Sequence, residues 1–179
     1  MSAENYLALE RGSEARSEYR DGEIFALTGA SRRHNLLSGN VYTAFRTQLR
    51  PRGCEVYVSD MRVKVSVSGL YTYPDVVVVC GEPQFEDAEV DTLLNPKVVV
   101  EILSKTTEDY DRGTKFVHYR TLPSLTEYLL VSQDHVHVEH YLHQSEGWLL
   151  TETDRREDVV ELPSVGACLA LAEIYDGVL

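Results

Sequence analysis

The chain has 179 residues, of which 43% are hydrophobic, and this predicts one domain with an ordinary core. Asp and Glu outnumber Lys and Arg by 29 to 17, and the net charge of −12 argues against a protein that coats nucleic acid or an anionic membrane through bulk charge. No apolar run reaches the roughly 18 residues of a membrane span, and the charged N-terminus is unlike a signal peptide.

The first third of the chain predicts two helices separated by a hairpin. Residues 3–10 are expected to form a short helix, and EYRDGEIFAL is expected to form a hairpin with its tight turn at Asp21-Gly22. Ser31 can cap a helix over about 33–49, because apolar residues recur there at four-residue spacing.

Positive charge gathers in this same part of the chain. Residues 1–72 sum to +2 and residues 73–179 to −14, so an anionic partner is expected to meet the N-terminal part. The candidate footprint is the set of arginines that flank the predicted helix: Arg32, Arg33, Arg46, Arg50 and Arg52. A solvated helix face explains the same pattern, so both interpretations stay open.

The middle of the chain is rich in strand patterns. Residues 55–59 and 62–67 alternate as half-buried strands do. The β-branched runs at 73–80 and 96–104 are continuous, which is typical of strands covered on both faces. A helix is expected over residues 109–121.

The last third predicts further strands and a final helix. Its expected elements are strands at 126–132, 135–142, 147–151 and 158–161 and a short helix near 168–175. The whole chain therefore predicts a single α/β domain built on one mixed sheet. Within it, residues 1–30 form an N-terminal helix and hairpin, residues 31–132 approximately the core, and residues 133–179 the C-terminal strands and short helix.

Two acidic residues interrupt the apolar runs of the middle strands. Asp75 stands ahead of one run, and Glu101 directly follows Val98–Val100. A buried carboxylate is costly unless a cation or hydrogen bonds compensate it, and a divalent ion such as Mg²⁺ would relieve repulsion between two of them. Lys115, on the following helix, could add the positive charge that phosphodiester cleavage needs. Strand capping by Asp75 and a plain salt bridge at Glu101 would leave the same pattern.

Six segments together resemble the PD-(D/E)XK nuclease superfamily, whose core is a helix, three strands, a helix and a strand. They are EYRDGEI, SRRH, YPDVVVV, VVVEILS, DRGTKFVHY and TEYLLV. Their order and spacing are most similar to the Uma family, described as putative restriction endonucleases. The resemblance implies a restriction-endonuclease-like core with extra C-terminal strands, and a Mg²⁺- or Mn²⁺-dependent endonuclease that hydrolyses DNA.

The resemblance also implies metal ligands. Asp75 matches the acid of the PD motif, and Glu101 matches the acid of the second half-motif. The backbone carbonyl of Ile102 would be a usual further ligand in this fold. Glu18 matches a family acid in the N-terminal hairpin and is a candidate additional acid beside the metal.

The catalytic lysine departs from the superfamily pattern. That pattern would place it at Leu103, whereas Lys115 matches a lysine of the family's helical segment. Lys105 stands where the family commonly has proline, so which lysine acts stays open. The residues expected to bind nucleic acid are Arg32, Arg33, His34 and Lys105.

Other functions remain open beside a DNA endonuclease. A nuclease fold without activity could serve as a nucleic-acid-binding or oligomeric interaction module, and a nuclease could act on RNA or branched DNA. A homodimer is expected, since an exposed sheet edge invites pairing and nucleases of this fold often use two copies. No membrane partner is expected.

Two further patterns are predicted to be structurally ordinary. Cys54, Cys80 and Cys168 are odd in number and far apart, which indicates no disulfide or zinc framework and fits a cytoplasmic protein. In HVHVEHYLH, residues 135–143, a strand would place His135, His137 and His143 on one face and His140 on the other. An exposed strand face is expected rather than a metal site, because no acid or cysteine stands at a convincing third ligand position.

Overall fold

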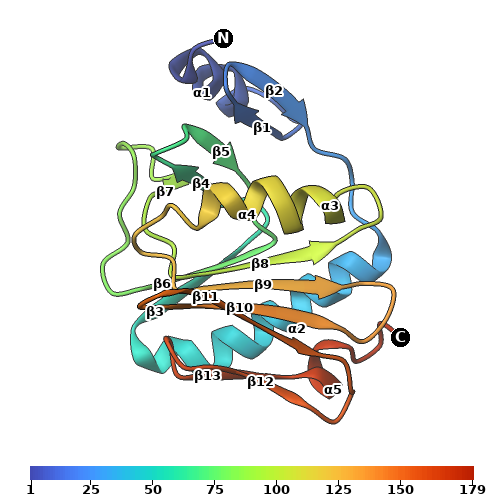
Figure 1. The fold of residues 1–179 in the computed structure, drawn as a ribbon. Coiled ribbons are helices and arrows are strands. Elements are labelled where there is room, and N and C mark those ends of the chain that lie inside the picture. Colours follow the sequence, from blue (N-terminus) through green and yellow to red (C-terminus); the bar gives the residue numbers. More distant parts are fainter.

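A computed structural model describes all residues from 1 to 179, and its largest layer is a six-stranded mixed sheet at the centre of the molecule (Figure 1). The strand order is β11-β10-β9-β8-β6-β3. The strands are β3 (Cys54–Val58), β6 (Val76–Cys80), β8 (Val98–Leu103), β9 (Glu127–Ser132), β10 (Val138–Gln144) and β11 (Gly147–Thr153). Within this sheet only β8 and β9 pair in parallel, and the chain between them contains the helical crossover that a parallel pair requires.

One face of this sheet is covered by α2 (Arg32–Leu49). Its apolar residues at four-residue spacing, Leu37, Val41, Phe45 and Leu49, are all fully buried in the largest core cluster. Ser31 caps the helix by accepting a hydrogen bond from the His34 backbone N–H at 3.1 Å, as the sequence predicted. A short 3₁₀ turn, Arg50–Arg52, ends it.

The opposite face is covered by a helical segment that begins with α3 (Glu108–Tyr110) and ends with α4 (Phe116–Tyr119). Between them, Asp111–Lys115 forms a π-helical turn. Every residue of β8 is buried, with Val98 and Val100 facing the α2 side and Val99 facing the other. The expectation of strands covered on both faces is therefore confirmed for β8.

A second, five-stranded sheet lies on the side of this helical segment, and α1 (Ala3–Arg11) packs on it through a cluster of tyrosines (Figure 1). Its strands are β1 (Ser17–Arg20), β2 (Glu23–Ala26), β4 (Arg62–Val65), β5 (Leu70–Thr72) and β7 (Thr92–Leu93). The expectation of one mixed sheet is wrong. The chain turns at Ser59, whose φ is 37°, so that β3 and β4 enter different sheets.

A third sheet closes the C-terminal end. It consists of β12 (Val159–Leu162) and β13 (Ala167–Ala170), and α5 (Leu171–Ile174) follows it. The helix expected near 168–175 is thus only one turn long. The first part of that range alternates between buried and partly exposed residues because it pairs as a strand with β12. No helix of the chain is both long and apolar enough to cross a membrane.

The cysteines are not all free, contrary to expectation. Cys54 and Cys80 stand opposite each other in the β3–β6 ladder and form a disulfide, while Cys168 is free. Strand pairing brings together two residues separated by 26 positions, and no local motif shows this pairing. The cysteines of this chain therefore do not indicate a cytoplasmic location.

The histidine-rich segment is also not a uniform exposed face. His140 is buried, and its Nε2 lies 2.6 Å from Glu127 Oε2. Glu127 Oε1 accepts a hydrogen bond from the Ser164 backbone N–H at 2.8 Å. The expectation was wrong for His140 because the C-terminal chain, which supplies Ser164, covers this part of the sheet.

Candidate active site

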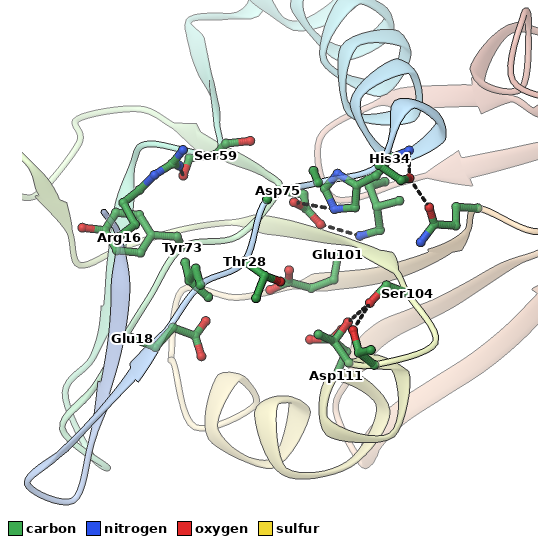
Figure 2. A pocket seen from close by; sticks show the side chains of 18 of the residues that line it. Arg16, Glu18, Thr28, His34, Ser59, Tyr73, Asp75, Glu101, Ser104 and Asp111 are labelled. Carbon is green, nitrogen blue, oxygen red and sulfur yellow. Dashed lines mark hydrogen bonds and ion pairs between the residues drawn. The ribbon is translucent and has the colours of Figure 1, made fainter. Parts of the chain in front are cut away.

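The two acids singled out in the sequence lie on neighbouring strands and line one cavity of about 610 Å³ (Figure 2). Asp75 immediately precedes β6, and Glu101 lies within β8. These strands are antiparallel, with Val76 opposite Val100, so Asp75 and Glu101 come at matching positions of the ladder. The cavity is bounded by the N-terminal end of α2, by the π-helical turn and by the chain that leaves β2.

Asp75 is held by two hydrogen-bonding partners. Its Oδ2 accepts from the Ile102 backbone N–H at 2.7 Å, and its Oδ1 lies 3.1 Å from His34 Nε2. The first contact caps the adjacent strand, as one alternative expected. The second brings a side chain from the first turn of α2 to the cavity, which fixes the direction of the carboxylate.

Lys115 occupies the centre of a cluster of carboxylates. Its Nζ lies 2.9 Å from Glu101 Oε1, 3.3 Å from Glu18 Oε1 and 3.6 Å from Asp111 Oδ1. It makes no ion pair with Asp75, and Lys105 is exposed on the surface. The prediction that Lys115 rather than Lys105 approaches the acids is confirmed through its contact with Glu101.

Three residues that were not expected from the sequence complete this cluster. The Tyr119 hydroxyl donates to Glu101 Oε1 at 2.9 Å, and the Thr72 hydroxyl donates to Glu18 Oε1. Asp111 joins Lys115 from the π-helical turn, a feature common at functional sites. The positions 111, 115 and 119 are spaced by four residues, and this helical periodicity could have revealed both Asp111 and Tyr119.

Burial and crowding shift the protonation of the cluster. Burial raises the pKa of Glu101 well above its usual value, and repulsion by Asp111 and Asp75 adds to this against the opposing effect of Lys115. Burial likewise raises the pKa of Asp111. Burial alone would lower the pKa of Lys115, but the surrounding negative groups, Glu101 first, hold it well above its usual value. Lys115 is therefore charged, and its single positive charge is outnumbered by the three neighbouring acidic side chains.

The donors suit a hard cation that takes few protein ligands. No group of three or more His, Cys, Asp or Glu side chains lies close enough to hold a metal ion by itself. Mg²⁺ usually takes only one or two carboxylates and completes its shell with water and substrate oxygens. Glu101 Oε1 accepts a hydrogen bond from the Tyr119 hydroxyl and contacts the Lys115 ammonium. Glu101 Oε2 has no hydrogen-bond partner and lies beside the cavity.

The residues expected to bind nucleic acid do not all lie at the cavity. Arg32 donates to the Gly177 carbonyl at 3.3 Å, and Arg33 lies 3.6 Å from Asp134. Of the predicted set, only His34 lines the cavity, and Lys105 does not. Arg16 lines it instead, from the chain just before β1.

The model of the Uma2 family, described as putative restriction endonuclease, matches residues 3–172. The chain belongs to the Uma2 family. Two relatives from Synechocystis sp. (strain ATCC 27184 / PCC 6803 / Kazusa) are similar to it. The uncharacterized protein sll1609 is 40% identical over 85% of this chain and 86% of its own length. The uncharacterized protein slr1290 is 37% identical over 99% of this chain and 92% of its own length.

A solved structure shares the fold of this Uma2 protein. It is a putative nuclease belonging to DUF820 from Anabaena variabilis ATCC 29413, with a TM-score of 0.82, 19% sequence identity, and coverage of 100% of this chain and 99% of that one. The predicted family and the predicted mixed α/β, nuclease-type fold are both confirmed.

Proposed function

We propose that this Uma2 protein is a metal-dependent endonuclease that hydrolyses phosphodiester bonds of DNA. The observation that carries the proposal is the cavity in which Asp75 and Glu101 meet from neighbouring strands while the buried ammonium of Lys115 lies against Glu101. Acids that can hold a cation, beside a fixed positive charge, suit the cleavage of a phosphate ester. The description of the family supports the same reaction class.

Asp75, Glu101 and the Ile102 carbonyl are the proposed ligands of Mg²⁺ or Mn²⁺, with Glu18 as an additional acid nearby. When bound, such an ion polarises the phosphate and lowers the pKa of a coordinated water. His34 contributes by holding Asp75 through Oδ1. Tyr119 contributes by holding Glu101 through Oε1.

Lys115 supplies positive charge rather than a base. Its pKa is held well above the usual value, so it retains its proton at neutral pH. An ammonium at this position can orient the attacking water and offset the negative charge that develops on the phosphate. Asp111, 3.6 Å from Lys115, helps to keep the lysine charged and directed toward Glu101.

A second candidate is a nuclease-fold module without activity. Both oxygens of Asp75 are engaged by the protein, and Lys115 is surrounded by three carboxylates, as in a purely structural network.

Strand β11 lies at the edge of the six-stranded sheet and exposes Leu149 and Leu150. We propose this edge as the contact of a homodimer. A cytoplasmic location is a separate proposal, and it rests only on the proposed DNA substrate.

Titration of purified protein with Mg²⁺ in the presence of plasmid DNA tests the proposal. We expect metal-dependent nicking that EDTA and Asp75→Ala both abolish, while Lys105→Ala retains it. Circular dichroism of each variant shows whether the fold persists. A folded wild-type protein that leaves plasmid DNA intact at all Mg²⁺ and Mn²⁺ concentrations would favour the inactive module.

A further inference from the structure

The groups of the candidate site are shielded from the surface. The side chains of Asp75, Glu101, Asp111 and Lys115 are between 4% and 17% exposed. The space that reaches them is a cavity of about 610 Å³, within the range typical of small-ligand pockets. A phosphate must therefore enter this cavity to meet the acids, because they do not stand on an open surface.

A short strap crosses the cavity. Residues 27–30, which we call the strap, connect β2 to α2 and line the cavity along their whole length. Figure 2 shows the strap crossing this view, with Thr28 amid Glu18, Asp75 and Glu101. The strap thus lies between the acids and a partner that approaches from this side.

Both ends of the strap are fastened. At its start, the Leu27 backbone N–H donates to the Arg16 carbonyl at 2.9 Å. Just after its end, the Ser31 hydroxyl donates to Gln133 Oε1 at 2.5 Å and also caps α2. Because only residues 28–30 lie between these attachments, the backbone of the strap has little freedom to move aside.

The cavity wall carries groups that suit unpaired nucleotides. Tyr73 and Tyr110 both line it, and neither is fully buried. The Arg16 guanidinium lies 5.9 Å from the centre of the Tyr73 ring, and its ion pair with Asp60 is exposed to solvent. Aromatic rings beside a positive charge bind single strands, since an unpaired base can stack on them, whereas a paired base keeps its faces inside the duplex.

We infer that the substrate of this site is single-stranded DNA, whose backbone enters the cavity beneath the strap while its bases stack on Tyr73 and Tyr110. This inference rests on the proposed nuclease function and names its substrate class. The enclosed acids, the fastened strap and the two tyrosines all favour one extended strand over an intact duplex.

Binding of DNA and cleavage of DNA are measured separately to test the inference of a single-stranded substrate. Fluorescence anisotropy compares a labelled single-stranded oligonucleotide with a closed dumbbell duplex of the same sequence, in Ca²⁺, which takes the same oxygen ligands as Mg²⁺. We expect the single strand to bind about tenfold more tightly or better. Equal or tighter binding of the dumbbell overturns the inference, and tighter binding of the matching single-stranded RNA overturns the assignment to DNA.

Two matched pairs of variants examine the wall and the strap. Tyr110→Leu is expected to weaken single-strand binding severalfold, whereas Tyr110→Phe keeps the ring and the affinity. Thr28→Trp is expected to weaken binding by filling the cavity, whereas Thr47→Trp leaves it unchanged, because Thr47 is exposed on α2 and does not line the cavity. Unchanged binding in both Tyr110→Leu and Thr28→Trp contradicts the inference.

Cleavage of the same oligonucleotides in Mg²⁺ separates this inference from the proposed function. Selective binding of the single strand without cleavage refutes the nuclease function and retains the binding preference. Cleavage of the dumbbell at the same rate as the single strand retains the nuclease function and refutes the inference.

Discussion

Two networks of buried or partly buried charge in this protein are built in opposite ways. The N-terminal network joins Arg11 and Arg62 to Asp87 and Asp91, with the shortest contacts of each pair at 2.8 to 2.9 Å. It has as many acids as bases and fastens α1 to the chain around β7. The site cluster, defined as Glu18, Glu101, Asp111 and Lys115, sets three acids against one ammonium beside the cavity.

The pKa values of the acids differ accordingly. Hydrogen bonds from Arg11 hold the pKa of Asp91 well below its usual value, so its ionised form stabilises the fold. Burial raises the pKa of Glu101 and of Asp111, so their ionised forms oppose folding. A balanced network contributes stability, whereas an excess of acids beside a cavity is the kind of perturbed charge that the proposed metal site would need.

The largest expected effect comes from removing the only positive charge of the site cluster. Lys115→Met should lower DNA cleavage at least about 100-fold and lower the free energy of unfolding by about 3 kcal/mol at pH 8, because buried carboxylates lose their partner. The loss of stability should shrink toward pH 5, since Glu101 and Asp111 then take up protons. Urea denaturation at both pH values measures this, and Lys105→Met should behave as wild type. An equal loss at both pH values would contradict the explanation.

The second largest expected effect is the stabilisation of the folded protein by Mg²⁺ at the proposed metal site. Because Mg²⁺ would bind only the folded protein, a concentration of 100 times its Kd should stabilise the wild type by about 2.7 kcal/mol. Asp75→Ala should show no such rise in melting temperature, and in EDTA it should lose only about 1 kcal/mol of stability, because the Ile102 backbone N–H loses its acceptor. Thermal melts of both proteins with EDTA and with millimolar Mg²⁺ measure this. A clearly destabilised Asp75→Ala and an unresponsive wild type would instead identify Asp75 as a structural residue.

The N-terminal network should respond to mutation in stability alone. Asp91→Asn should lower the free energy of unfolding by about 1 kcal/mol, because the acid is partly exposed and solvent screens its ion pairs. The pKa of Asp91 is depressed in the folded state, so its contribution is present above the unfolded pKa of roughly 3.9 and is lost as the pH falls toward the folded value. Denaturation from pH 7 to pH 2 measures this, and a loss of cleavage in this variant would show that the two networks are coupled.

The smallest expected effect concerns the hydroxyl that holds Glu101. Tyr119→Phe keeps the buried ring and removes one hydrogen bond, which should cost about 1 kcal/mol of stability. Cleavage should fall only severalfold, since Lys115 still contacts Glu101. Steady-state cleavage and chemical denaturation measure the two effects. Tyr175→Phe serves as a control, because the Tyr175 hydroxyl is also buried but binds the backbone of Ser132, outside the site.

Much of the local structure follows from patterns within single segments. The four-residue spacing of Leu37, Val41 and Phe45 predicts α2, since such spacing places an apolar stripe on one side of a helix. The β-branched run around Val98–Val100 predicts a strand buried on both faces. The family motifs predict the acids Asp75 and Glu101 and the lysine Lys115, whose meeting with Glu101 the structure confirms.

Contacts between remote segments were decided only by the tertiary structure. Glu18 reaches Lys115 across almost a hundred positions, the ladder of β3 and β6 pairs Cys54 with Cys80, and the turn at Ser59 sends neighbouring strands into different sheets. The period of a segment specifies which of its faces is buried, but not which other segment covers that face. The packing of the whole chain determines which segment covers which face, and the cavity at the strap exists only because that packing brings distant segments together.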